Sequence, residues 1–106
     1  MKTTLIINLY DEEETTVSEK NYKEILTILT YNVTISENDN EILDKRIEAL
    51  AKKWYETEPK TQEAWNEMEK DWDKYDEQIK DNKNVIKKCE EAIKLIETFA
   101  EVEGWE

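Results

Sequence analysis

The sequence predicts a mostly helical α+β protein, in which a short N-terminal β-α-β unit with two strands precedes three helices. Two observations carry this prediction. Residues 3–10 (TTLIINLY) are β-branched and apolar without a helical period, whereas after residue 40 large apolar residues recur three and four positions apart. Because 106 residues suffice for one core but not for two, we predict a single domain, with an α/β segment at 1–37 and a helical segment at 38–106.

The first strand should end near Tyr10, because the four acids of Asp11–Glu14 repel one another and favour a solvated turn. A helix is expected next, over about 19–29, and a second strand at Asn32–Ser36 (NVTIS). With a helix between them, the two strands would be parallel neighbours.

The short helix over 19–29 has local support at its start. Ser18 is a good N-cap, and Val17 before it can pack on Tyr22 four residues after the cap. The stretch ILTILTY is also rich in strand formers, which leaves open the first arm of a hairpin instead.

The next helix is expected to follow the turn at Glu37–Asn40, where Asn38 and Glu41 have the spacing of a capping box. Its apolar stripe is formed by Leu43, Ile47, Leu50, Ala51 and Trp54. Pro59 should end this helix, because the residue before a proline is pushed out of the helical region. The phase of the stripe also changes there, since steps of three and four residues onward from it do not reach Trp65.

A longer seam organises the remainder of the chain. Its large apolar residues fall three and four apart: Trp65, Met68, Trp72, Tyr75, Ile79, Ile86, Cys89, Ile93, Ile96 and Ala100. Asp81–Asn84 (DNKN) consists largely of poor helix formers, so we predict a bend there and an antiparallel hairpin of two helices, 59–80 and 83–102. Gly104 is suited to a left-handed C-cap, with Trp105 folded onto the last turn.

The same seam supports an alternative, because its spacing stays in register through Asn82. One continuous helix over 60–101 would then place Asn82 at a core position, where a polar residue specifies partner and register. So long a helix would be expected to bury its seam against a second copy, as a homodimer.

Composition excludes most catalytic and metal chemistry. The chain has no His, one Gly and one Cys, which removes His-based triads and zinc sites, glycine-rich phosphate loops and an internal disulfide. Asp71, Asp73 and Tyr75 start like a calcium loop, but Asp76 stands where glycine is needed. We therefore expect no cofactor, no metal and no enzymatic activity. Cys89 is expected to be a small buried apolar residue.

Charge is the outlying property of the sequence. There are 27 Asp and Glu against 15 Lys and Arg, a net charge of -12, and each half of the chain, divided at Pro59, carries -6. Such a field opposes binding to nucleic acid or to an anionic membrane and attracts basic protein surfaces, although solubility alone would also explain it. With no apolar run of membrane-spanning length and no signal peptide, a cytoplasmic protein is expected.

The acids are arranged most regularly on the helix after Pro59. Glu69, Asp73 and Asp76 are four and three residues apart, so their carboxylates should follow one face at intervals of roughly 5 to 6 Å. We predict a partner-binding surface formed by Glu63, Glu67, Glu69, Asp73, Asp76 and Glu77. The competing interpretation is an ordinary solvated face, in which Lys70, Lys74 and Lys80 pair with these acids at helix-neighbour spacing.

A small, strongly acidic, His-free chain that begins MKTTLIINLY resembles the anti-defence proteins encoded by bacteriophages and mobile elements, including anti-CRISPR proteins and other DNA mimics. That class shares size and charge but no sequence motif, so no functional residue is carried over. The resemblance implies a non-enzymatic inhibitor that binds a basic nucleic-acid-binding protein, such as a CRISPR nuclease or effector, without contacting nucleic acid or membrane. The alternative is a helical interaction or assembly module that self-associates through its aromatic seam.

Overall fold

The computed structural model describes residues 4–9 and 13–103. At the N-terminal end, β1 (Thr4–Leu9) and β2 (Glu13–Ser18) form a two-stranded antiparallel sheet in which Leu5 is paired with Val17 and Ile7 with Thr15. Alternation directs Ile7 and Val17 to the inner face, and both are buried.

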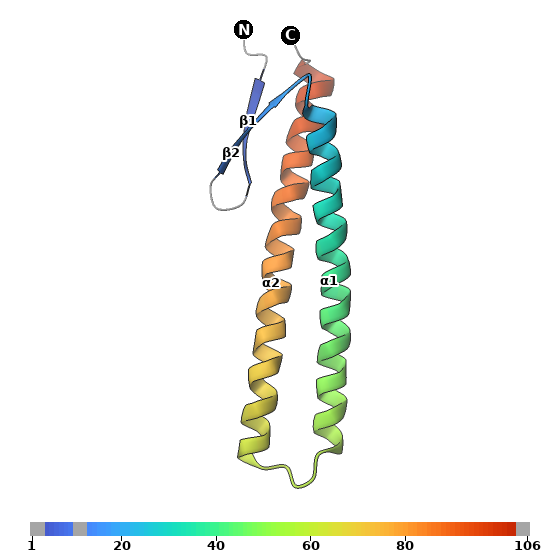
Figure 1. The fold of residues 1–106 in the computed structure, drawn as a ribbon, viewed down its shortest axis with the longest axis vertical. Coiled ribbons are helices and arrows are strands. Elements are labelled where there is room, and N and C mark those ends of the chain that lie inside the picture. The colour runs from blue at the N-terminus through green and yellow to red at the C-terminus, as the bar shows by residue number, and fades with distance from the viewer. Residues whose placement is uncertain (1–3, 10–12, 104–106) are drawn as a thin grey trace.

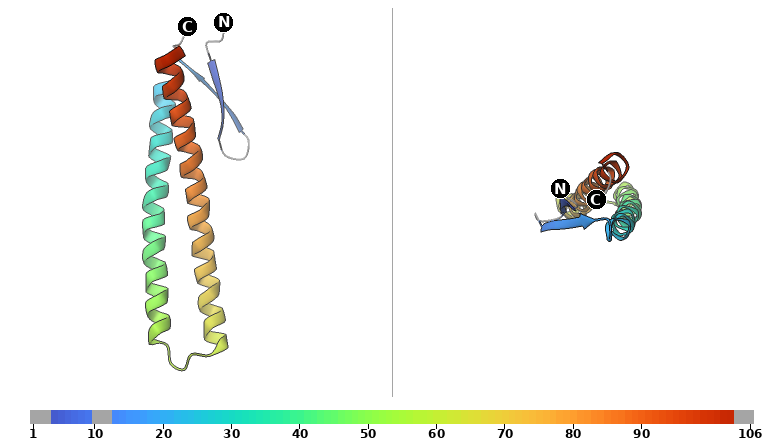
Figure 2. Two further views of the ribbon diagram at one scale, coloured as in Figure 1. Left: turned by 180° about the vertical axis from the view of Figure 1, so that it is seen from behind. Right: turned by 90° about the horizontal axis from the view of Figure 1, so that it is seen from above.

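Two long helices form the body of the molecule, α1 (Tyr22–Glu56) and α2 (Gln62–Thr98), and a π-helical turn over Phe99–Glu103 follows α2. The helices run antiparallel, side by side, along a rod of 70 × 21 × 17 Å (Figure 1). The hairpin of β1 and β2, called the β-hairpin below, lies at the end opposite the helix connection. The view from above shows it on one face of the helix pair (Figure 2). The mostly helical α+β class is confirmed.

The predicted β-α-β unit is wrong. The second strand is β2, which pairs antiparallel with β1, and the segment predicted as a strand, Asn32–Ser36, lies inside α1. The expected turn at Glu37–Asn40, with its capping box, is also helical. Consequently α1 runs through the point at which the predicted α/β and helical segments meet.

The strand formers of this region are accommodated because α1 carries a seven-residue repeat that can pack on a second helix. Its inward positions include Leu26, Leu29, Val33, Leu43 and Ile47, all buried or half-buried. Threonines with poor helix propensity bond to the carbonyls four residues earlier, Thr27 Oγ1 to Lys23 O at 3.0 Å and Thr34 Oγ1 to Thr30 O at 3.1 Å. Packing along the whole length therefore overrides the local preference for strand.

The three helices predicted after residue 37 are two in the structure, and the bend at Asp81–Asn84 is wrong. α2 continues through this segment, as the alternative of a helix over 60–101 proposed. Its seam is covered by α1 of the same chain, so the antiparallel hairpin is formed by α1 and α2. A second copy is not required to cover the seam.

Asn82 explains why the poor helix formers do not break α2. Its side-chain Nδ2 donates to Asp39 Oδ2 at 2.7 Å and to Asn40 Oδ1 at 2.8 Å, both on α1. Polar side chains along an apolar seam can form their hydrogen bonds in only one register of the two helices. The three residues thus link the middles of α1 and α2.

The two helices start differently, because the side chain before α1 bonds to β2 whereas the side chain before α2 caps its helix. Asn21, not Ser18, precedes α1, and its Oδ1 accepts from Ser18 N at 2.7 Å while its Nδ2 donates to Thr16 O at 3.1 Å, which ties β2 to the helix. Thr61 caps α2, with its Oγ1 accepting from Ala64 N at 3.1 Å.

The connection between the helices follows the prediction that the helix ends before Pro59. α1 ends at Glu56, and Lys60 Nζ donates to the carbonyls of Tyr55 and Thr57 at 3.1 and 2.9 Å, so a cation satisfies the last carbonyls of the helix.

The main core lies where the β-hairpin covers the helix pair. Its buried members come from both strands and both helices: Ile7, Val17, Leu29, Cys89, Ala92 and Ile96. Cys89 is fully buried, as its seam position predicts. The predictions made for Tyr10, Asp11, Glu12, Gly104 and Trp105 lie outside the described residues.

Candidate functional site

The half of α2 nearest the helix connection carries most of that helix's negative charge. Residues 62–81 contain eight acids and three bases, whereas residues 82–98 contain three acids and four bases. All six predicted partner-binding carboxylates lie in the first of these stretches, and all are exposed. A continuous helix therefore displays them on a rigid support at one end of the rod (Figure 1).

The lysines expected to neutralise these acids do not pair with them. Among the residues that the structure describes, the ion pair within 4.0 Å joins Lys60 and Glu58, in the helix connection. The pairs expected of Lys70, Lys74 and Lys80 with neighbouring carboxylates are not formed. The surplus negative charge on this part of α2 is therefore exposed and has no ion pair within 4.0 Å to a described residue.

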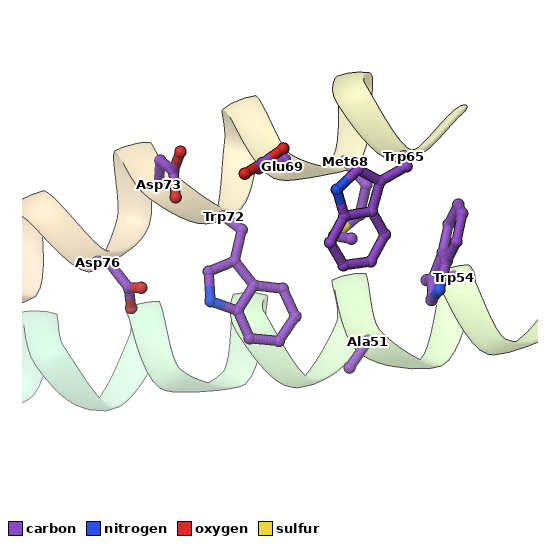
Figure 3. A pocket seen from close by; sticks show the side chains of 8 residues that line it. All are labelled: Ala51, Trp54, Trp65, Met68, Glu69, Trp72, Asp73 and Asp76. Carbon is purple, nitrogen blue, oxygen red and sulfur yellow. The ribbon is translucent and has the colours of Figure 1, made fainter. Parts of the chain in front are cut away.

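Three of the six carboxylates border a groove between the two helices (Figure 3). The groove has a volume of about 450 Å³ and is lined by Ala51, Trp54, Trp65, Met68, Glu69, Trp72, Asp73 and Asp76. In the close-up, Trp72 and Asp76 point from α2 toward α1, whereas Asp73 points away from α1. Aromatic side chains thus form the interior of this groove and carboxylates stand around it.

Trp54 and Trp65 close the groove at the connection end. Their ring centroids lie 5.1 Å apart with the planes at 72°, an edge-to-face contact between α1 and α2. Lys60 Nζ lies 5.8 Å from the centroid of the Trp54 ring. Trp65 remains 40% exposed, so the contact leaves part of its surface open to solvent.

The other predicted carboxylates lie elsewhere. Glu67 borders a second groove of about 250 Å³, whose lining also includes Asp71 and the base Lys53. Glu63 and Glu77 are exposed and line neither groove. Of the six residues, Glu69, Asp73 and Asp76 border the same groove, and we call these three the carboxylate row.

The sequence predicts Trp65, Met68 and Trp72 as seam positions and Ala51 and Trp54 as members of the apolar stripe of the preceding helix, and it assigns none of these groove residues to a site. Their role depends on which helix lies opposite α2 at the connection end. The sequence does carry one signal, since the largest aromatic residues of the seam cluster at this end while its smaller residues lie beneath the β-hairpin.

α1 adds acids that the sequence did not single out. Asp44 and Glu48 precede Ala51 by seven and three residues, which places them on the same side of α1 as this groove residue. Both are exposed. Carboxylates thus flank this side of the helix pair from both helices.

Neither a metal site nor a membrane segment emerges from the described residues. Over 4–9 and 13–103, no group of three or more His, Cys, Asp or Glu side chains is arranged to hold a metal ion. The residues considered for a calcium loop, Asp71 to Asp76, are part of α2. Within the same ranges, no helix has the length and apolar character needed to cross a membrane.

The chain was compared with protein-family models, with curated proteins and with solved structures, and none of the three comparisons found a match.

Proposed function

We propose that this protein is a non-enzymatic inhibitor that binds a basic nucleic-acid-binding protein, such as a CRISPR nuclease or effector, on the surface that nucleic acid would occupy. The observation that supports this proposal is the carboxylate row, Glu69, Asp73 and Asp76, exposed on a continuous helix without ion pairs to neighbouring lysines. Unpaired carboxylates at fixed positions attract cationic groups without first breaking internal contacts.

Rigidity distinguishes this arrangement from an acidic tail. Nucleic acid presents closely spaced charges along a stiff backbone, and its binding proteins meet them with lysine and arginine. Carboxylates one helical turn apart on α2 offer a comparable regular row. The polar link between Asn82 and α1 holds the helix in one register, so the row keeps its geometry when a partner binds.

The alternative function, self-association through the aromatic seam, has less support. Met68, Trp72, Tyr75 and Ile79 are half-buried between α1 and α2. Exposing the seam to a second copy would require the helix pair to open. The carboxylate row needs no such change.

A capture experiment with a matched charge control tests the proposal. The immobilised chain is exposed to bacterial lysate at low and high salt, and retained proteins are identified. We expect retention of nucleic-acid-binding proteins that weakens steeply with salt and is lost in the charge-reversed variant Glu69→Lys, Asp73→Lys, Asp76→Lys.

The control variant reverses three acids on the other half of α2, Glu90→Lys, Glu91→Lys and Glu97→Lys, and all three residues are exposed. It changes net charge by the same amount and should retain the partners. Equal loss in both variants would show that only net charge matters, and equal binding by the charge-reversed variant would remove the carboxylate row from the proposal.

A further inference from the structure

The groove at the connection end combines aromatic rings with negative charge, whereas the carboxylate row alone supplies only the charge. Indole rings from both helices form its interior, Trp54 from α1 and Trp65 and Trp72 from α2 (Figure 3). Its rim carries the carboxylate row, and its eight lining residues include neither lysine nor arginine. A ligand in this groove would meet aromatic faces and negative charge together.

Both chemistries favour an organic cation. A cation near the face of an aromatic ring is attracted by the ring quadrupole, and tryptophan is the best of the rings for this purpose. The chain already shows the interaction, since Lys60 Nζ lies 5.8 Å from the Trp54 centroid. Lys60 lines a neighbouring pocket with Thr61 and Gln62, not the groove. Trp54 therefore has one cation of its own chain near its ring, and the residues that line the groove supply none.

Among cationic side chains, the groove suits arginine. A guanidinium is planar and stacks on an indole ring, and its fork donates two hydrogen bonds to one carboxylate. A lysine ammonium is a compact, strongly hydrated charge that has neither property. The volume of about 450 Å³ lies within the usual range of ligand pockets, so a side chain can enter without displacing a helix.

We infer that the groove between Trp54, Trp65 and Trp72 binds an arginine side chain from a basic segment of the partner protein. This inference rests on the proposed function, in which the carboxylate row attracts that basic segment. It adds that the indole rings select arginine over lysine.

Two synthetic peptides of equal charge, nona-arginine and nona-lysine, test the inference on the full chain. Tryptophan fluorescence measures the affinity, and the indole N–H signals in ¹H–¹⁵N spectra identify the rings that respond. Nona-arginine should bind about fivefold more tightly than nona-lysine, and it should shift the indole signals of the groove.

Trp65→Leu, at a position that is already 40% exposed, should lower the affinity for nona-arginine about fivefold and change that for nona-lysine little. The matched control is Tyr55→Leu, which removes an aromatic ring that is 84% exposed and does not line the groove. It should leave both affinities unchanged.

Equal affinity of the two peptides for the unmodified chain would overturn the inference, and so would an arginine preference that survives in Trp65→Leu. Neither result touches the proposed function, which fails instead if the charge-reversed variant binds both peptides as the unmodified chain does. The peptide comparison and the indole shifts use the unmodified chain, so they decide the matter even if Trp65→Leu does not fold.

Discussion

Replacing Lys83 by proline tests whether α2 is one helix. Lys83 lies in the segment DNKN, and its side chain is exposed without an ion pair to the described residues. In an α-helix its backbone N–H donates to the carbonyl of Ile79. Proline removes this donor and clashes with that carbonyl, at a cost of about 3 kcal/mol or more.

The same substitution acts on Asn82, because a residue before proline is pushed out of the helical region. Displacing Asn82 breaks its bonds to Asp39 and Asn40, which should add about 1 kcal/mol. The total of about 4 kcal/mol corresponds to a fall in Tm of about 16 °C or more for a chain of this size.

Thermal unfolding followed by circular dichroism at 222 nm measures the effect of Lys83→Pro, with Lys83→Ala as the matched control. The alanine variant loses the same side chain and should unfold within about 2 °C of the unmodified chain, since lysine and alanine differ little in helix propensity. A bend at Asp81–Asn84 would place residue 83 at the first position of a new helix, where proline is tolerated. A proline variant as stable as the alanine variant would therefore refute the continuous helix.

Three further substitutions, each measured by urea unfolding, test the contacts that stabilise α2 and its packing on α1 and the β-hairpin. Asn82→Ala removes both bonds to α1 and should lower the free energy of unfolding by about 1 to 2 kcal/mol; no loss would mean that the polar link contributes nothing. Ile96→Ala truncates a fully buried residue and should lower the free energy of unfolding by about 2 to 5 kcal/mol. Its control, Leu95→Ala, at a position that is 49% exposed, should lower it by less than about 1 kcal/mol. Similar losses in the two variants would place the core elsewhere. Thr61→Ala removes the cap of α2 and should cost about 1 kcal/mol, whereas Thr61→Ser keeps the hydroxyl and most of the stability, so equal losses would argue against the cap.

The C-terminal half of the fold is largely predictable from the sequence. Between Met68 and Ile96 the seam residues are the buried and half-buried face of α2, and Pro59 marks the end of the preceding helix. Continuity through DNKN is not predictable, because local propensity and seam register point in opposite directions there. A contact between Asn82 and residues more than 40 positions earlier decides in favour of register.

The structure of the N-terminal half could not be predicted from local sequence preferences, for a related reason. Ser36 and Asn40 interrupt the apolar stripe of α1, and the β-branched residues around them favour a strand in isolation. Only a partner helix of matching length shows that both polar residues belong to one inward face. Asn40 bonds Asn82 directly, and Ser36 is buried.

The candidate site also has a part that the sequence predicts and a part that it does not. The phase of the seam predicts that Glu69, Asp73 and Asp76 are exposed, and in the structure all three are exposed and border one groove. The groove beside them requires Trp54 to stand against Trp65, which follows from the pairing of α1 with α2 and not from either helix alone. Single-helix reasoning therefore locates the acids but not the aromatic surface.

Competition with nucleic acid tests the central claim most directly. A protein captured by the chain is purified and loaded with fluorescently labelled duplex DNA, and anisotropy is followed as the chain is added. If the carboxylate row occupies the nucleic-acid surface, the unmodified chain releases the DNA and the charge-reversed variant does not. A complex that holds DNA and the chain together, or equal release by both proteins, would contradict the account.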